Sequence, residues 1–188
     1  MIPFLPQWPD TPIVVYLPPW PDDRIAQLIA IGDALPSEPA TVVQGYETVT
    51  KRCTTISWIR TDNPDALPFY NALANDVLKV NAEKWNFDLF GFIDNLQYTV
   101  YHEGDEFSWH VDCGPKLPPR KLSVVVQLSD PADYEGGDLQ LRVGGVVETA
   151  PRAKGAVILF PSFIDHHVTL ITRGMRKALV AWIAGPAF

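Results

Sequence analysis

The feature that most constrains the fold is a series of short, β-rich segments in the second half of this 188-residue chain. They begin after Trp85 and alternate with turn residues, a pattern typical of a β-sandwich or barrel. Gly144-Gly145, between LQLRV and VVETA, predicts a two-residue hairpin turn. The predicted strands cover residues 96–102, 107–112, 121–129, 138–150, 155–160, 166–171 and 176–184.

The first half of the chain predicts two helices and two short strands. Asp22 is a candidate cap for a helix over about 23–35, and Asn63-Pro64 precedes a helix that extends to about Lys84. The strands are expected at 12–17 and 53–59. Helices followed by antiparallel strands predict an α+β protein, a jelly-roll core buttressed by N-terminal helices. We expect a single domain over 1–188, with a helical support region at 1–95 and the jelly-roll core at 96–188.

Composition and charge argue against several classes of protein. The chain is 47% hydrophobic and 20% charged, as expected of a soluble globular protein. Its net charge of -7 disfavours a nucleic-acid partner. The apolar runs are too short to span a membrane, and the start MIPFLPQWPDTP lacks the basic region of a signal peptide. Two cysteines, Cys53 and Cys113, make no disulfide framework, so a cytoplasmic protein is predicted.

A histidine and an aspartate in the run FSWHVD form the first candidate metal site. His110 and Asp112 are two residues apart, and side chains at that spacing on a strand project to the same side. A second histidine would complete a two-histidine, one-carboxylate triad, which suits non-haem Fe(II) because it leaves positions open. From spacing alone either His166 or His167 can supply it. For the pair alone, a surface histidine and aspartate at a strand end is the alternative interpretation.

A single arginine in an apolar run is the second chemical signal. Arg176 lies ten residues after His166, in the segment RKALVAWIA. An arginine directed into a barrel needs an anionic partner. One carboxylate of a dicarboxylate would match its guanidinium in a bidentate manner.

Three stretches together resemble the prolyl-4-hydroxylase-like branch of the Fe(II)/2-oxoglutarate-dependent dioxygenases, which includes the PKHD-type hydroxylases. They are YHEGDEFSWHVD, RKLSVVVQLSDPADYEGGDL and GAVILFPSFIDHHVTLITRGMRKALVAW, in the family's order and spacing. The resemblance implies a double-stranded β-helix that uses Fe(II), 2-oxoglutarate and O2, and it allows ascorbate as an accessory cofactor. It also implies hydroxylation of a prolyl, peptidyl or small-molecule substrate, with release of succinate and CO2.

The resemblance also assigns ligands. It places the distal ligand at His166 and leaves His167 at the variable position that follows. The basic residue that pairs with 2-oxoglutarate in the family corresponds to Arg176. The expected metal-ligating and catalytic residues are His110, Asp112 and His166.

Further cofactor-binding residues are expected on two strands. Tyr101 corresponds to a tyrosine that often hydrogen-bonds the co-substrate, although a core tyrosine fits the sequence equally well. In the strand from Leu122 to Leu128, the polar residues Ser123 and Gln127 share one face with Val125. By resemblance both polar residues are expected near the co-substrate, and a structural role is the alternative for Ser123.

Two other interpretations compete with this one. A cupin-like metalloenzyme that does not use 2-oxoglutarate would give Arg176 no role. A non-catalytic jelly-roll binding module would lack at least one ligand.

The carboxylate at Asp112 favours hydroxylation over halogenation, because halogenating relatives leave that position to halide. The loops at about 36–52 and 113–120 are candidates for gripping an unidentified substrate, and CGPKLPPRK is a candidate cover for the site.

Overall fold

The computed structural model describes residues 13–44, 47–114 and 119–188, and for 41–44 and 47–53 it describes the backbone alone. Three features of the sequence lie outside the described residues. They are the N-terminal segment 1–12, the centre of the candidate covering loop at 115–118, and the side chain of Cys53.

Two helices and two antiparallel sheets make up the described chain. The helices are α1 (Asp22–Asp33) and α2 (Leu67–Lys84), and two 3-10 turns are η1 (Pro64–Ala66) and η2 (Pro131–Asp133). The strands are β1 (Val15–Leu17), β2 (Glu38–Gln44), β3 (Glu47–Ile59), β4 (Gly91–Phe92), β5 (Leu96–His102), β6 (Phe107–His110), β7 (Arg120–Gln127), β8 (Tyr134–Gly136), β9 (Leu139–Val143), β10 (Val146–Thr149), β11 (Val157–Pro161), β12 (Asp165–Val168) and β13 (Ile171–Ala184).

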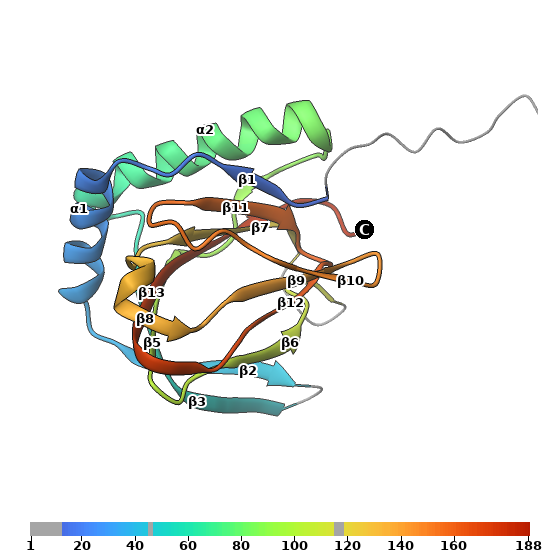
Figure 1. Cartoon of the computed structure of the whole chain (residues 1–188). Helices are drawn as coiled ribbons and strands as arrows, with labels where there is room; N and C mark the ends of the chain where they lie inside the picture. Colours follow the sequence, from blue (N-terminus) through green and yellow to red (C-terminus); the bar gives the residue numbers. More distant parts are fainter. Residues whose placement is uncertain (1–12, 45–46, 115–118) are drawn as a thin grey trace, which may run out of the picture.

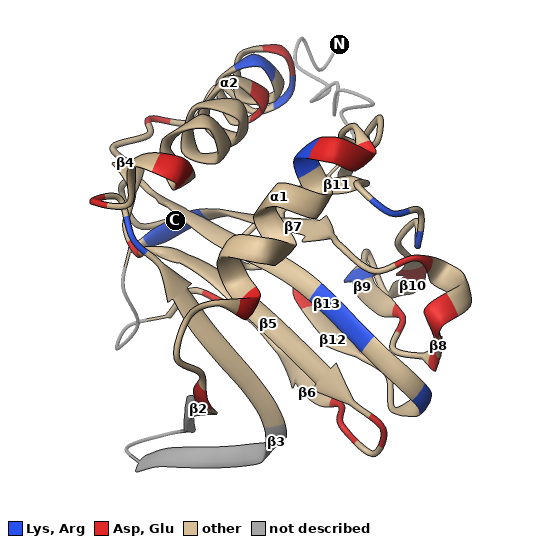
Figure 2. Cartoon of the chain, turned by 90° about the vertical axis from the view of Figure 1, so that its left-hand side faces the viewer, with Lys and Arg blue, Asp and Glu red and all other residues tan. Residues whose placement is uncertain are grey.

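The two sheets face one another, and the helices cover the outer face of the larger sheet (Figures 1 and 2). The larger sheet has the order β1-β11-β7-β13-β5-β3-β2, with β4 and β8 paired to β13. The smaller sheet has the order β10-β9-β12-β6. This arrangement confirms the predicted α+β class with a jelly-roll core. Within the described residues, neither helix is long and apolar enough to cross a membrane.

Alternation along β7 separates the two cores. One set of its side chains packs with α1 and α2 in the outer core, and the other set faces the space between the sheets, as predicted. The helix-side residues are Leu122, Val124 and Val126, and Leu128, directly after the strand, joins the same core. Of the opposite set, Val125 belongs to the inner core and Ser123 and Gln127 are buried polar residues.

Helix α2 is anchored to the larger sheet by a tyrosine. The Tyr70 hydroxyl donates to the carbonyl of Ile59 at 2.7 Å and accepts from the backbone N–H of Leu96 at 3.1 Å. Phe69, Leu73, Val77 and Val80 on α2 are buried, whereas Leu67, the first residue of the helix, is exposed.

Several element boundaries differ from the predictions. Asp22 does not cap α1: Pro21 occupies the cap position, and Asp22 is the first helical residue. The hairpin is confirmed, since Gly144 and Gly145 join β9 to β10 with positive φ angles of 57° and 86°. Strands β2, β4 and β8 were not predicted.

The region predicted as helical support also contributes strands to the larger sheet. Strand β1 pairs with β11, and β3 pairs with β5, with Ser57 opposite Tyr98. The division of the chain at residue 96 coincides with the start of β5. Because β3 and β5 pair across this boundary, the division describes the order of elements along the chain, and the domain assignment stays a prediction.

Candidate active site

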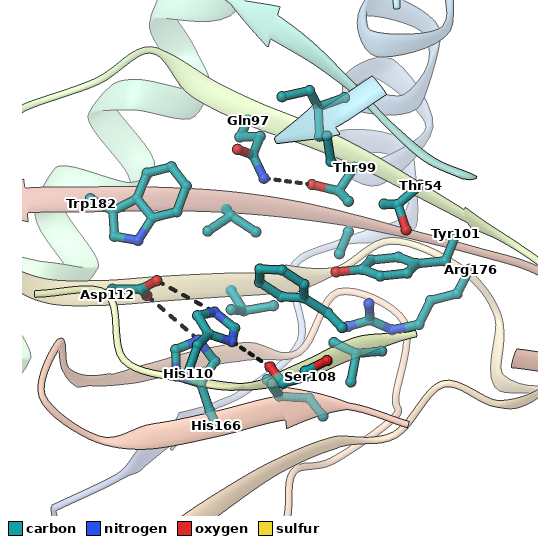
Figure 3. Close-up of a pocket in the computed structure, with 18 of the residues that line it drawn as sticks. Thr54, Gln97, Thr99, Tyr101, Ser108, His110, Asp112, His166, Arg176 and Trp182 are labelled. Carbon is teal, nitrogen blue, oxygen red and sulfur yellow. Dashed lines mark hydrogen bonds and ion pairs between the residues drawn. The ribbon is translucent and has the colours of Figure 1, made fainter. Parts of the chain in front are cut away.

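Two strands of the smaller sheet bring the predicted ligands together. His110 ends β6, His166 lies on β12, and the two residues are opposite one another in the strand register. Asp112 follows β6, and its backbone N–H donates to the carbonyl of Ser162 at 2.9 Å. One potential ligand atom from each of His110, Asp112 and His166 lies within 4.8 Å of the others (Figure 3).

Hydrogen bonds to the backbone fix which nitrogen of each histidine faces the centre. Nδ1 of His110 lies 2.8 Å from the carbonyl of Ser108, and Nδ1 of His166 lies 2.9 Å from the carbonyl of Ile164. A carbonyl only accepts, so each Nδ1 carries a proton, and Nε2 is the nitrogen with the lone pair when the ring is neutral. Each Nε2 lies 3.6 Å from an oxygen of Asp112. This tautomer is the one that a metal-binding imidazole needs.

The protonation states also suit a metal. Burial lowers the pKa of His110 to about 4, and His166 beside it adds to the shift. Burial opposes ionisation of Asp112, but His166, His110 and the Ser123 hydroxyl outweigh it and hold the pKa of that carboxyl below its usual range. Metal ligands must be neutral imidazoles and ionised carboxylates. The donor set of two nitrogens and one oxygen therefore fits Fe(II) in a facial triad.

His167 lies on the other face of β12. Its Nε2 is 2.8 Å from Oε1 of Gln140, and its ring stacks on Trp109 with the centroids 3.9 Å apart. The guanidinium of Arg142 lies 4.1 Å from the Trp109 ring centroid. The metal-binding cluster found among the described residues contains His166 and not His167.

A cavity of about 440 Å³ opens beside the three ligands, and Arg176 lies in its wall. Arg176 is 1% exposed, and its Nη2 donates to Oε1 of Gln127 at 2.9 Å. Its Nε has no hydrogen-bond partner, and among the described residues it forms no ion pair. A buried guanidinium with a neutral partner and a free donor is a strong site for an anion.

The remaining predicted residues occupy different positions around the cavity. Tyr101 lines it, opposite Arg176 in the β5–β13 register, and the guanidinium lies 5.2 Å from the tyrosine ring centroid. Ser123 and Gln127 do not line it. Ser123 donates to Oδ2 of Asp112 at 2.7 Å, so the structural alternative describes it better. Gln127 accepts a hydrogen bond from the guanidinium of Arg176.

The structure adds residues that the sequence did not single out. Arg120 stacks on Trp182, with its guanidinium 3.7 Å from the ring centroid, and its Nη2 donates to Asp94 at 2.8 Å. Trp58 lines the same cavity from β3 and donates its indole N–H to Glu38 at 2.9 Å. The alternation Arg176, Ala178, Val180, Trp182 along β13 was the available signal for Trp182.

Comparison with known sequences gives the same family. Residues 96–184 match the model of the 2OG-Fe(II) oxygenase superfamily. A PKHD-type hydroxylase of Cupriavidus metallidurans is 42% identical over 93 residues, which cover 46% of this chain and 41% of that protein. A PKHD-type hydroxylase of Caulobacter vibrioides is 30% identical over 174 residues, which cover 85% of this chain and 72% of that protein. The match therefore spans less than half of the Cupriavidus relative and most of the Caulobacter one.

Solved structures agree in fold. A prolyl-4-hydroxylase of Pseudomonas putida superposes with a TM-score of 0.71 at 20% identity, covering 93% of this chain and 94% of that one. A prolyl hydroxylase of Trichoplax adhaerens, in complex with a hypoxia inducible factor peptide fragment, has a TM-score of 0.71 at 17% identity and covers 92% and 83%. The sequence matches, together with the His110–Asp112–His166 cluster, show that the chain belongs to the 2OG-Fe(II) oxygenase superfamily, in the branch of the PKHD-type hydroxylases.

Proposed function

We propose that this protein is an Fe(II)- and 2-oxoglutarate-dependent hydroxylase in which His110, Asp112 and His166 bind the metal. Arg176 holds the distal carboxylate of 2-oxoglutarate. The observation that carries the proposal is that the cavity beside the triad contains a fully buried arginine with no ion-pair partner among the described residues. An uncompensated charge at that depth is costly, and a dicarboxylate bound across the cavity would neutralise it.

Each residue contributes a defined part of the chemistry. Iron, 2-oxoglutarate and oxygen supply the oxidising power for C–H hydroxylation, with succinate and CO2 as co-products. Backbone carbonyls hold the Nδ1 protons of His110 and His166, so Nε2 is the atom that each ring would offer to the metal. Gln127 accepts from one N–H group of Arg176, and the unpartnered Nε of Arg176 would be available to the co-substrate. Tyr101, buried in the same wall, excludes water and offers a hydroxyl donor.

The substrate proposed is a peptide that presents a proline or a similar aliphatic side chain. Three aromatic residues line the cavity and offer ring faces against which an aliphatic ring can pack, namely Trp58, Phe107 and Trp182. Arg120, fixed between Trp182 and Asp94, has a buried Nε without a partner, which suits a peptide carbonyl. The structural neighbour from Trichoplax adhaerens is a prolyl hydroxylase with a peptide bound, and this supports the same substrate class.

The first experiment follows succinate formation from 2-oxoglutarate in the presence of Fe(II). Arg176→Met keeps the volume of the side chain and removes its charge. We expect the KM for 2-oxoglutarate to rise roughly 10- to 100-fold, the effect of losing a charged hydrogen bond of about 1.5–3 kcal/mol. The matched control is Arg173→Met, because Arg173 is exposed and, among the described residues, forms its ion pair with Glu135. Metal binding without any 2-oxoglutarate turnover in the wild type would favour the cupin-like enzyme.

A peptide panel tests the substrate class. Proline-containing peptides, matched peptides with alanine in place of proline, and free L-proline are each added to the iron-loaded enzyme. Stimulated succinate formation, with a mass gain of one oxygen atom on the proline peptide alone, is the expected result. If free proline alone stimulates succinate formation, the substrate is a small molecule and the peptide proposal is wrong.

A further inference from the structure

Asp112 is held from behind by two buried serines. The Ser123 hydroxyl, on β7, donates to Oδ2 of Asp112 at 2.7 Å. The hydroxyl of Ser162, in the turn after β11, lies 2.9 Å from the Ser123 hydroxyl. Both serines are 0% exposed, and neither lines the cavity. Their hydroxyls therefore act on the carboxylate and have no access to a substrate.

The direction of the protons in this chain of hydroxyls follows from the hydrogen-bonding capacity of each group. An ionised carboxylate only accepts, so the single proton of Ser123 points to Asp112. The Ser123 oxygen is then an acceptor, and Ser162 must donate to it. Hydrogen bonds aligned in this way polarise one another, so the proton of Ser162 strengthens the bond from Ser123 to Asp112.

The turn that contains Ser162 also orients a second ligand. The backbone carbonyl of Ser162 accepts from the N–H of Asp112 at 2.9 Å. Two residues on, the carbonyl of Ile164 accepts from Nδ1 of His166 at 2.9 Å, and the N–H of Ile164 donates to Pro161 at 2.9 Å. A single turn between β11 and β12 thus sets the position of two of the three ligands.

We propose that Ser162 and Ser123 form a hydroxyl relay that positions Asp112 to bind the metal through one oxygen, an inference that rests on the proposed function. The hydrogen bond from Ser123 occupies a lone pair of Oδ2 and fixes the rotation of the carboxylate. Oδ1 lies 3.6 Å from Nε2 of His110 and Oδ2 lies 3.6 Å from Nε2 of His166, so both oxygens are near the centre, and Oδ2 is the one that already accepts from Ser123. A carboxylate bound through both oxygens would take a position that a chelating co-substrate needs. The two serines are positioning residues, and they touch no reactant.

Metal affinity tests the relay without any need for turnover. Metal-free protein is titrated with Co(II), and the visible d–d absorption of the bound ion gives both the affinity and the geometry. Removal of a partner one step behind a ligand typically weakens metal binding 10- to 100-fold. We expect Ser123→Ala to weaken Co(II) binding about 10- to 100-fold and to alter the spectrum, and Ser162→Ala to weaken it less.

The double variant separates a relay from two independent packing effects. If Ser162 acts through Ser123, then Ser123→Ala/Ser162→Ala binds Co(II) no more weakly than Ser123→Ala alone. The matched control is Ser129→Ala. Ser129 is a buried serine just after β7 whose hydroxyl accepts from the N–H of Lys177 at 2.7 Å, away from the ligands. Thermal unfolding in the presence of a chelator checks that each variant is folded.

The outcomes are distinguishable. Single variants that bind Co(II) with the affinity and spectrum of the wild type would overturn the relay and leave the proposed function intact. Additive losses in the double variant would also overturn it, since they would mean that Ser162 acts independently of Ser123. A wild-type protein that binds no Co(II) would overturn the proposed metal site itself, and the relay with it.

Discussion

His110 and His166 are register partners across β6 and β12, and their ring centroids lie 4.2 Å apart. Because side chains alternate along a strand, a slip of one residue in this pairing would turn His166 away from Asp112. The candidate metal site is therefore specified by strand pairing, and the outward-facing His167 cannot replace His166 without a change of register.

Substitution of the two adjacent histidines is expected to change metal affinity by very different amounts. His166→Ala removes a proposed ligand, and we expect at least a roughly 100-fold loss of metal affinity, more than the loss of a supporting partner causes. His167→Ala removes a stacked ring and a hydrogen bond to Gln140 on the outer face, and we expect a change of less than about threefold. Titration with Co(II) measures both. The reverse order of effects would show that His167 is the ligand.

Metal-free protein is expected to lose stability as the pH falls from 7 to 5. The pKa of His110 is about 4 in the folded protein, against about 6.5 when the chain is unfolded. Between these values the unfolded chain binds a proton that the folded chain does not. The free energy of unfolding therefore decreases as the pH is lowered. The contribution of His110 is about 2 kcal/mol at pH 5, or roughly 4–8 °C in Tm.

The control for this prediction is His110→Gln, which has no titrating group at that position. Thermal unfolding in chelator at pH 7 and pH 5 should show a smaller fall in Tm for the variant than for the wild type. An equal fall in both proteins would contradict the role given to His110, and would assign the pH dependence to other groups.

Helix α2 stabilises the larger sheet but does not set the geometry of the metal ligands. Substitution of two leucines on this helix tests whether stability and metal affinity are independent. Leu73 is 0% exposed, and Leu73→Ala should lower the free energy of unfolding by about 2–5 kcal/mol. Leu78, on the same helix, is 60% exposed, and Leu78→Ala should change it by less than about 0.5 kcal/mol. Co(II) affinity should be unchanged in both variants. A weaker metal site in Leu73→Ala alone would mean that the helix helps to set the ligand geometry.

The core strands were predictable because their pattern is local. Strand β5 begins and ends at the predicted residues 96 and 102, and the hairpin forms at Gly144-Gly145 because those glycines adopt positive φ at little cost. Strand β2 was missed because its start, Glu38-Pro39, has the composition of a turn and is extended only by pairing with β3. Tertiary pairing overrode local preference there.

The site was predictable where a motif carries it. The spacing of His110 and Asp112 placed two ligands on one side, and the family resemblance chose His166 over His167. Ser162 had no signal in the sequence, since its role depends on the turn that brings it to Ser123. The face of β7 that holds Ser123 was predictable, but not that its hydroxyl meets a ligand instead of the cavity.

The central claim is that this triad binds Fe(II) and 2-oxoglutarate together, and an anaerobic absorption spectrum tests it most directly. Fe(II) and 2-oxoglutarate are added to metal-free protein without oxygen, and the weak visible charge-transfer band of the chelate is recorded for the wild type and for Asp112→Ala. We predict a band in the wild type that is weaker at the same iron concentration in the variant, which lacks the carboxylate ligand. A wild-type protein that binds iron but shows no band with 2-oxoglutarate would contradict the account.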